Sequence, residues 1–418
     1  MRSTYSAPRR VAVVGAGMVG LSTAWFLQDR GVEVTVVDRV GVAAGSSRGN
    51  AGWLTPSLST PLPDPAVLEY GIRAVLSPAS PVYVPPTLQL DLVRFAVSFA
   101  RHSTARRWRR SMRALAPVNR LSLAAFDALR DGGVTGETYA AEPFLAAYRR
   151  EEERRVLVEE LQHVAEAGQD VELDLLTGEE ARRLEPALSE EVGAAVVLHG
   201  QRFINPRVFV QRLADAVRER GGQIRERTPV TRVVDRPDGV RLLGTAGDVG
   251  RFDAVVLANG TWLGELARPF GVRTLVQAGR GYSFNIPVEH LPAGPVYLPA
   301  QRVACTPLGD RLQVAGMMEF RRPDAPLDPR RIQAIVDAAR PMFRGADFSD
   351  RRDEWVGSRP CTPDGLPLIG PTTSRRVHVA GGHGMWGIAL GPVTGRLVAE
   401  TLTTGRTPPE LTPFDPLR

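Results

Sequence analysis

The clearest hydrophobic pattern lies near the start of the chain, where residues 11–14 read Val-Ala-Val-Val. A short apolar run without polar alternation is typical of a parallel strand that is buried on both faces. Residues 18–29 then have the pattern of a buried helix, Gly31 stands where such a helix ends, and residues 34–37 repeat the strand pattern. The order of strand, helix and strand predicts a βαβ unit at the start of a parallel sheet.

Three glycines stand at the first junction of strand and helix. Gly15, Gly17 and Gly20 have the spacing G-x-G-x-x-G. In this motif the first glycine allows a tight turn, the second lets a pyrophosphate approach the backbone, and the third lets the helix pack closely on the strand. Asp38 ends the second strand, near the ~20 residues after the motif at which a ribose-binding carboxylate is expected. The unit therefore predicts a dinucleotide site, and by itself it does not decide between FAD and NAD.

The pattern changes after this unit. Residues 41–56 are small, polar and glycine-rich, and residues 57–89 hold many prolines and predict an irregular excursion. Residues 88–115 have a helical pattern with an apolar stripe and a following cluster of arginines. Such a helix could lie on an anionic membrane surface, or it could be an inter-domain helix with a solvated basic end.

Later segments return to strand patterns. Residues 205–222 predict a helix that starts at Pro206, and residues 224–234 and 251–262 predict strands. Residues 272–320 alternate strand patterns with turns, which suggests an antiparallel sheet, and residues 377–405 read as strand, glycine loop and helix. A ligand reached from both ends of the chain is easier to explain with FAD than with NAD.

The predicted fold class is therefore α/β. We expect a Rossmann-type FAD-binding domain assembled from discontinuous segments, together with an antiparallel-sheet α+β substrate domain. The cofactor domain would comprise residues 1–60, 190–270 and 375–418. The substrate domain would comprise residues 61–189 and 271–374, with the basic helical excursion near residues 88–120.

Composition narrows the function further. The 418 residues are 43% hydrophobic and 23% charged, with no apolar run of membrane-span length and no signal-peptide pattern, so we expect a cytoplasmic protein. The two cysteines are too few for a disulfide framework, and no cysteine–histidine cluster predicts a metal. The net charge is +6, but aromatic residues make up only 6% and no nucleic-acid-binding module is present, so we expect no nucleic acid partner. All 52 basic residues are arginine, which excludes Schiff-base chemistry by a lysine.

Four sequence blocks together resemble a known family. They are VVGAGMVGLSTAWFL with VVDR, SSRGNAGWLTP, DAVVLANGTW followed by GRGYS, and WVGSRPCTPDGLPLIG followed by GGHGMWGIALGPVTGRL. The chain resembles the FAD-dependent D-amino acid oxidase superfamily, and most closely its bacterial D-amino acid dehydrogenase branch. The fourth block is the most specific of the four.

The resemblance implies a set of cofactor-binding positions. Residues matching the family's FAD contacts are Gly15, Gly17, Met18, Val19, Gly20, Asp38, Arg39, Ser47, Asn50, Ala51, Gly52, Trp53, Val230, Ala258, Gly260, Gly384, Met385, Trp386, Gly387 and Ile388. Covalent members of the superfamily have a cysteine where this chain has Gly357, so we expect noncovalent FAD. Some oxidases of the family also use a lysine over the flavin to activate oxygen, and this chain contains none.

Three residues match catalytic or substrate-binding positions of the family. Arg359 would pair with the substrate carboxylate; the alternative is that it pairs only with Asp364 or Glu354. Tyr282 would donate to the same carboxylate or line the pocket, or it would pack in the core. His383 would lie by the flavin or the substrate amine, or it would be a structural histidine.

The implied reaction is oxidative deamination of a D-amino acid, or of a cyclic amino acid such as D-proline. Hydride would pass from the α-carbon to flavin N5, and the electrons would pass to an acceptor other than oxygen, such as a quinone. The basic helix would then allow peripheral contact with the inner face of a membrane. The alternatives are an oxidase for glycine, sarcosine or another secondary amine that releases hydrogen peroxide, and a dehydrogenase for one pathway-specific amine.

Overall fold

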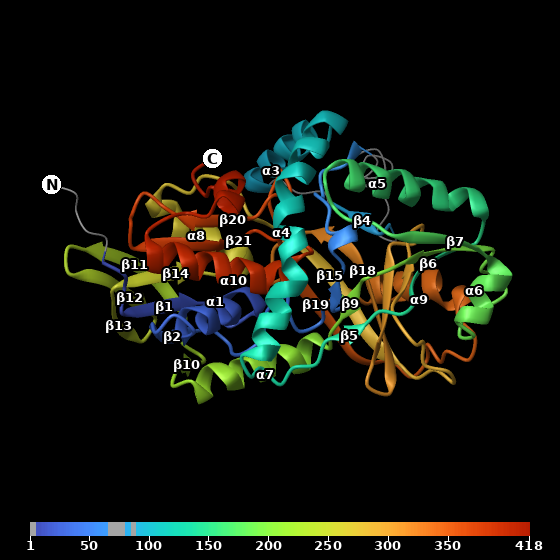
Figure 1. The fold of residues 1–418 in the computed structure, drawn as a ribbon, viewed down its shortest axis with the longest axis horizontal. Coiled ribbons are helices and arrows are strands. Elements are labelled where there is room, and N and C mark those ends of the chain that lie inside the picture. Colours follow the sequence, from blue (N-terminus) through green and yellow to red (C-terminus); the bar gives the residue numbers. More distant parts are fainter. Residues whose placement is uncertain (1–5, 66–79, 85–88) are drawn as a thin grey trace.

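The computed structural model describes residues 6–65, 80–84 and 89–418, which form two lobes (Figure 1). One lobe is built on a six-stranded sheet in the order β10-β2-β1-β14-β21-β20. All its neighbouring strands run parallel except β20, which pairs antiparallel with β21. The strands are β1 (Arg10–Val14), β2 (Glu33–Val37), β10 (Gln223–Arg225), β14 (Ala254–Leu257), β20 (Leu368–Pro371) and β21 (Val377–Gly381).

Alternate residues of β1 enter two different cores. Val11 and Val13 pack with the helices α1 (Met18–Gln28), α7 (Pro206–Glu219) and α10 (Gly387–Thr404). Ala12 and Val14 pack on the other face with α8 (Leu263–Ala267) and the antiparallel meander β11 (Val230–Arg236), β12 (Gly239–Gly244) and β13 (Gly247–Phe252). A strand buried on both faces needs the uninterrupted apolar run that the sequence shows.

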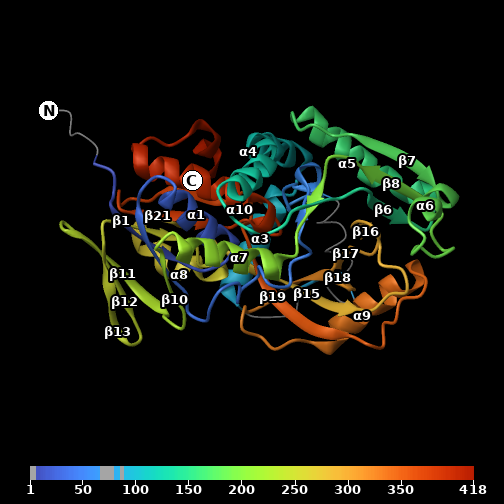
Figure 2. The same ribbon diagram turned by 60° about the horizontal axis from the view of Figure 1, so that its bottom comes forward.

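The second lobe is built on a larger, mainly antiparallel sheet, in the order β19-β15-β18-β17-β16-β6-β8-β7, with β4 beside β18. The helix α9 (Pro329–Ala339) packs against one face of this sheet, and α5 (Arg155–Glu166) and α6 (Gly178–Leu184) also belong to this lobe (Figure 2). The strands are β4 (Val82–Tyr83), β6 (Phe144–Tyr148), β7 (Leu173–Thr177), β8 (Ala194–Leu198), β15 (Gln277–Ile286), β16 (Val296–Leu298), β17 (Val303–Leu308), β18 (Arg311–Phe320) and β19 (Arg352–Cys361).

Two elements connect the lobes. The long helix α4 (Ala105–Asp131) lies between them and contacts both α10 and α5 (Figure 1). A small antiparallel sheet joins β3 (Trp53–Leu54), β9 (Arg202–Phe203) and β5 (Tyr139–Ala140). Before α4 comes α3 (Leu90–His102), and the break between these helices falls where the Thr104 hydroxyl accepts from the Arg107 N–H as an N-cap.

The predicted fold class is confirmed, and the structure corrects details within it. β8 lies in the second lobe although it was predicted within the cofactor segment 190–270, and β20 lies in the first lobe although it was predicted with the substrate segments. The predicted strand over 224–234 is two strands, β10 and β11, in different sheets. The sequence of a short apolar strand does not show which sheet it joins, because strands are buried in both sheets. Much of the predicted irregular excursion over 57–89 lies outside the described residues.

Candidate active site

The turn between β1 and α1 depends on two glycines. Gly15 has φ +114°, in the region that favours glycine, and a Cβ there would overlap the carbonyl oxygen of Ala258 at the end of β14. A Cβ on Gly20 would overlap the carbonyl oxygen of Gly15, so this glycine permits the close packing of α1 on the turn. Together they hold the N-terminus of α1 at the carboxyl edge of the parallel sheet, where dinucleotide phosphates bind in such folds.

The N-terminus of α1 faces the loop that follows β2. Gly17 is the N-cap residue of α1, and as a glycine it has no side chain to cap the helix. The Met18 N–H donates to the Ser47 hydroxyl at 3.2 Å, so the predicted cofactor residues Gly17, Met18 and Ser47 lie together. Val19 occupies the next position of α1 and is partly buried against the core of this lobe. This arrangement fits a diphosphate between the glycine turn and the 41–56 loop.

Asp38 is held beside the glycine turn by backbone donors. One carboxylate oxygen accepts from the Ala16 N–H at 2.9 Å, and the other accepts from the N–H groups of Val40 and Gly41 at 2.8 and 2.9 Å. A carboxylate has about four acceptor positions, so one remains for a ribose hydroxyl. The Arg39 guanidinium lies 3.3 Å from the centre of the Trp262 ring, so Arg39 connects the end of β2 to the segment after β14.

The remaining predicted cofactor residues of the β14 side also lie near this edge. The Ala258 N–H donates to the Val14 carbonyl at 2.8 Å, next to the glycine turn. The Thr228 N–H donates to the Asp38 carbonyl at 2.8 Å, so the chain that leads into Val230 runs past Asp38. Gly260 has φ +60°, and no atom lies within 4 Å of the position of a Cβ there. Its backbone therefore borders open space, as a cofactor-contacting backbone requires.

The loop over residues 50–53 meets the loop before α10. The Asn50 amide donates to the Met385 carbonyl at 3.5 Å, and its oxygen accepts from the Gly52 N–H at 2.8 Å. Gly52 has φ +79° and a Cβ there would overlap the Ile204 carbonyl oxygen. The contact places segments about 335 residues apart in the chain side by side.

Trp53, predicted to contact the cofactor, packs largely against residues of the second lobe. The indole N–H of Trp53 donates to the Thr306 hydroxyl at 2.9 Å, and that hydroxyl donates to the Ala51 carbonyl at 2.8 Å. The Trp53 ring makes edge contacts with Phe144 and Tyr297 of the second lobe. Trp53 thus fastens the 50–53 loop to the large sheet and forms part of the cavity wall.

The segment 384–388 forms the N-terminus of α10. Gly384 has φ +55°, its N–H donates to the Pro360 carbonyl at 2.9 Å, and no atom lies within 4 Å of a Cβ position. Trp386 is the N-cap residue, without a side-chain cap, and its indole N–H donates to the Thr60 carbonyl at 2.8 Å. Gly387 begins the helix and Ile388 is buried in it. Open backbone before an uncapped helix N-terminus fits the electron-rich edge of a reduced flavin.

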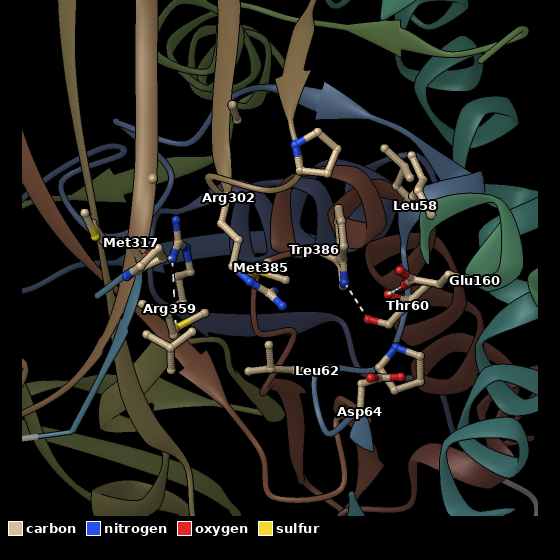
Figure 3. A pocket seen from close by; sticks show the side chains of 18 of the residues that line it. Leu58, Thr60, Leu62, Asp64, Glu160, Arg302, Met317, Arg359, Met385 and Trp386 are labelled. Atoms are coloured by element: carbon tan, nitrogen blue, oxygen red, sulfur yellow. Dashed lines mark hydrogen bonds between the residues drawn. The ribbon is translucent and has the colours of Figure 1, made fainter. Parts of the chain in front are cut away.

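Arg359 extends across the large sheet into a cavity between the lobes (Figure 3). It stands on β19 opposite Gly279 of β15, and its guanidinium lies over Gly281, two residues further along β15. A Cβ on Gly281 would overlap this guanidinium, so the glycine gives Arg359 its path. Burial lowers the pKa of Arg359, yet an arginine at ordinary pH remains charged.

The guanidinium of Arg359 is anchored by a single backbone oxygen. The Arg359 Nη1 group donates to the Met317 carbonyl at 2.6 Å. Met317 has a left-handed backbone at φ +69°. The predicted alternative partners are occupied by other arginines, since Glu354 pairs with Arg351 at 3.0 Å and Asp364 pairs with Arg418 at 2.8 Å. A guanidinium with donors to spare inside a largely apolar cavity is suited to a carboxylate.

The structure places Tyr282 on the opposite face of the large sheet from Arg359. Its neighbours Gly281 and Gly279 face Arg359, whereas Tyr282 packs in the core with α9 and its hydroxyl donates to Glu319 at 2.7 Å. Burial and this hydrogen bond raise the pKa of the Tyr282 phenol. This geometry agrees with the core-packing alternative, because side chains of successive strand residues point to opposite faces.

His383 lies beneath the α10 N-terminus rather than in the cavity wall. One ring nitrogen is 2.9 Å from the Thr394 hydroxyl, and the side chain is 4% exposed. Burial lowers the pKa of His383 to about 4, so the imidazole is neutral at ordinary pH. These contacts agree with the structural alternative for this histidine.

The cavity itself has a volume of ≈ 970 Å³ and is lined by residues from both lobes and from α3, α4 and α5. Asn50, Met385 and Trp386 form its cofactor-side wall, and Arg359 enters from the large sheet. Sequence reasoning missed several polar residues that line it: Tyr148, Glu160, Tyr297 and Arg302. None stands in a recognisable motif, and only the fold brings them together. Among the described residues, no cluster of His, Cys, Asp or Glu could hold a metal ion.

The lobe with the glycine turn and the discontinuous parallel sheet, joined to a large antiparallel sheet over a cavity, defines a flavin-binding oxidoreductase. The chain belongs to the FAD dependent oxidoreductase family, whose model matches residues 10–401. It is an FAD-dependent enzyme, and the open backbone at Gly260 and Gly384 fits that cofactor.

Two curated proteins are similar to this chain over most of its length. The D-amino acid dehydrogenase of Cereibacter sphaeroides is 30% identical over 410 residues, covering 96% of this chain and 92% of the relative. The D-amino acid dehydrogenase of Rhodopseudomonas palustris is 30% identical over 405 residues, covering 94% of each. Among solved structures, glycine oxidase from Geobacillus kaustophilus has a TM-score of 0.74 at 22% identity, covering 98% of this chain and 99% of that chain, which shows a shared fold.

Proposed function

We propose that this enzyme oxidises a D-amino acid, or a cyclic amino acid such as D-proline, to the imine, which water then converts to the 2-oxo acid. The observation that carries the proposal is Arg359, a charged guanidinium that reaches over Gly281 into an apolar cavity bordered by the cofactor loops. The names of the two relatives support the same substrate class.

The proposed task of the protein is orientation. Arg359 would hold the substrate carboxylate through two parallel N–H donors. A further N–H of the guanidinium, on Nη1, would remain hydrogen-bonded to the Met317 carbonyl. With the carboxylate fixed, the α-carbon can lie over the flavin face next to Met385 and Trp386. FAD, when bound, supplies N5 as the hydride acceptor. The neutral amine provides the electron pair of the imine, so no side-chain base is required.

We further propose that the electrons leave to an acceptor other than oxygen. The chain has no lysine to activate oxygen in the way that some oxidases of the family do. The cavity is also continuous with an apolar wall from α3 and the large sheet, formed by Leu92, Phe95, Phe99 and Phe320, which suits a hydrophobic acceptor such as a quinone.

Peripheral membrane contact is part of this proposal. The outer face of α3 exposes Leu90, Val93 and Val97, three and four residues apart, so they share one stripe. Arg94 and Arg101 stand in the same helix, and they would complement anionic lipid headgroups. In the described part of the chain, no helix has the length and apolar character needed to span a membrane. Sedimentation with anionic vesicles tests this contact, and an absence of binding at low salt would refute it.

The function is tested by anaerobic reduction of the purified yellow holoenzyme. D-amino acids, their L-forms, glycine, sarcosine and D-proline would be added in turn while absorbance near ~450 nm is followed. We expect bleaching by D-forms, slow recovery of the colour in air and rapid recovery with a quinone analogue. Bleaching by glycine or sarcosine with rapid recovery in air would support the oxidase alternative. Bleaching by none of these compounds would overturn the proposed substrate class.

A further inference from the structure

The pairing between β15 and β18 contains a β-bulge at the cavity wall. Two residues of β18, Met317 and Met318, stand opposite the single residue Gly281 of β15, and the register shifts by one residue at this point. The backbone of Met317 has φ +69°, a left-handed conformation that few residues other than glycine and asparagine adopt. In one common type of bulge the first residue has this conformation and is usually glycine. A methionine there indicates that the surrounding structure imposes the bulge.

Both residues of the bulge contact the guanidinium of Arg359. The Met317 carbonyl accepts from Nη1 at 2.6 Å, and the Met318 sulfur lies 3.9 Å from the same nitrogen (Figure 3). A Cβ on Gly279 would overlap that sulfur, and a Cβ on Gly281 would overlap the guanidinium. In a regular antiparallel ladder, a strand carbonyl points at the neighbouring strand and not at a side chain. The two glycines therefore make room for Arg359, and the bulge supplies the atoms that hold it.

A buried polar network lies behind the bulge, on the face of the sheet that points away from Arg359. Glu319, the residue after the bulge, is fully buried. One of its oxygens accepts from the Arg280 guanidinium at 3.2 Å and from the Tyr282 hydroxyl at 2.7 Å. Its other oxygen accepts from Arg321 at 3.4 Å. We call Glu319, Arg280 and Tyr282 the rear network.

The hydrogen bond from Tyr282 to Glu319 spans the bulge. Glu319 stands opposite Arg280 on one side of the bulge, whereas Tyr282 stands opposite Gly316 on the other side. The single carboxylate of Glu319 therefore joins the two strand pairs between which β18 makes its two-residue detour. The best-attested use of a buried ionic group is to fix a register, because apolar residues could fill the same space without loss of stability. The position of the rear network thus assigns it to the bulge.

Building on the proposed function, we propose that Glu319 is a positioning residue for the substrate carboxylate. The rear network holds the bulge so that the Met317 carbonyl fixes the Arg359 guanidinium in one orientation, with its other donors directed to the substrate. Glu319 does not line the cavity and acts only through the backbone of β18. Tyr282, whose motif suggested direct contact with the carboxylate, then acts on it indirectly, through Glu319.

Binding of a carboxylic acid and of its amide tests this proposal without turnover. The holoenzyme is titrated with pentanoate and with pentanamide, while the visible spectrum of the flavin is followed. The unaltered enzyme should prefer pentanoate, because a guanidinium pairs with a carboxylate through charge-assisted hydrogen bonds. Glu319→Gln keeps the size of the side chain and removes its charge. We expect the preference to fall by about 10-fold in this variant, less than the effect on the order of 100-fold that a displacement of about 1 Å produces.

Two further variants keep the test decisive. Tyr282→Phe removes one donor to Glu319 and leaves the buried ion pair intact, so it carries the test even if Glu319→Gln does not fold. We expect it to lower the preference by about 5-fold. Asp350→Asn is the matched control, because Asp350 also accepts from two arginines, Arg311 and Arg352, at 3.2 Å each, but at the other end of β18. It should leave the preference unchanged within about 2-fold.

The ratio of the two affinities separates a positioning role from a merely structural one, because partial unfolding or loss of FAD weakens both ligands alike. An unchanged ratio in every rear-network variant that folds would overturn the proposal, as would an equal fall in Asp350→Asn. An unaltered enzyme that binds pentanoate and pentanamide equally would contradict the role of Arg359 on which the proposal rests. A preference that depends on Glu319 supports the proposal even where no amino acid reduces the flavin, a result that would overturn the proposed function alone.

Discussion

The two sides of the active-site cavity are built on different principles. On the cofactor side, the decisive atoms belong to the backbone: the glycine turn, the N-terminus of α1 and the open stretch at Gly384. On the substrate side, we propose that the decisive atoms belong to the long side chain of Arg359, which extends from β19 of the large sheet into the cavity. The first side therefore depends on where side chains are missing, and the second depends on which way side chains point.

This difference has a physical origin. A diphosphate is recognised by N–H groups and a helix dipole, which every residue can supply provided that the chain approaches closely. An amino acid is recognised by charge and shape, which only particular side chains can supply. The comparison predicts that added methyl groups damage the cofactor side by excluding FAD and damage the substrate side by misplacing an arginine.

The largest expected effect follows from Gly20→Ala. The new methyl group would overlap the Gly15 carbonyl oxygen, and separating α1 from the turn should cost about 4 kcal/mol or more, as severe core overpacking does. We expect loss of bound FAD, measured by the ratio of flavin to protein absorbance, together with a lower Tm. Gly264→Ala, where no atom lies within 4 Å of the new Cβ, is the control. A Gly20→Ala protein with full FAD content would contradict the account of the turn.

Gly281→Ala should break the substrate side alone. Its methyl group would occupy the path of the Arg359 guanidinium, and a displacement of about 1 Å costs on the order of 100-fold in rate. We expect kcat/KM to fall by this order while FAD content and Tm change little. Steady-state kinetics beside flavin absorbance measure both. A variant that loses FAD and activity in parallel would show that the two sides are not separable in this way.

The smallest effect at neutral pH concerns two buried histidines of the cofactor lobe. Burial lowers the pKa of both His378 and His383 to about 4, below the ordinary value of 6.5. Between pH 6.5 and 4 the unfolded chain therefore binds more protons than the folded chain. The contribution of these histidines to the free energy of unfolding is fully present above pH 6.5 and is lost as pH falls towards 4.

The loss should reach on the order of 3 kcal/mol for each histidine. Thermal unfolding followed from pH 7.5 to pH 4.5 measures it. The variant His378→Leu should lose about half of this acid sensitivity, and its activity at pH 7.5 should be retained. An unchanged pH dependence would show that His378 does not remain neutral in the folded protein.

The cofactor side was accessible from the sequence because its signals are local. Gly15, Gly17 and Gly20 carry their meaning in their spacing, and Asp38 follows at the end of the next strand. Even Gly384 and Trp386, far along the chain, stand in a strand–loop–helix pattern that repeats the same logic. Such patterns can be recognised without knowledge of the tertiary structure, because each is contained in a few dozen residues.

The substrate side was less accessible because strand register decides it. Tyr282 and Gly281 are neighbours in the chain, yet they face opposite sides of β15, and only pairing with β19 shows that Gly281 shares the face of Arg359. His383 stands in the loop before α10, but its ring lies against the Thr394 hydroxyl within that helix rather than in the cavity wall. Arg302 lines the cavity and has a left-handed backbone, but no sequence pattern around it predicts either feature.

The central claim is that Arg359 holds the substrate by its α-carboxylate. The direct test uses the D-amino acid that reduces the flavin fastest and its carboxamide, each with the unaltered enzyme and with Arg359→Met, under anaerobic stopped flow. We predict that the unaltered enzyme prefers the carboxylate by about 100-fold and that the variant treats both compounds alike within about 3-fold. Equal rates with the unaltered enzyme, or a preference that persists without Arg359, would contradict the account.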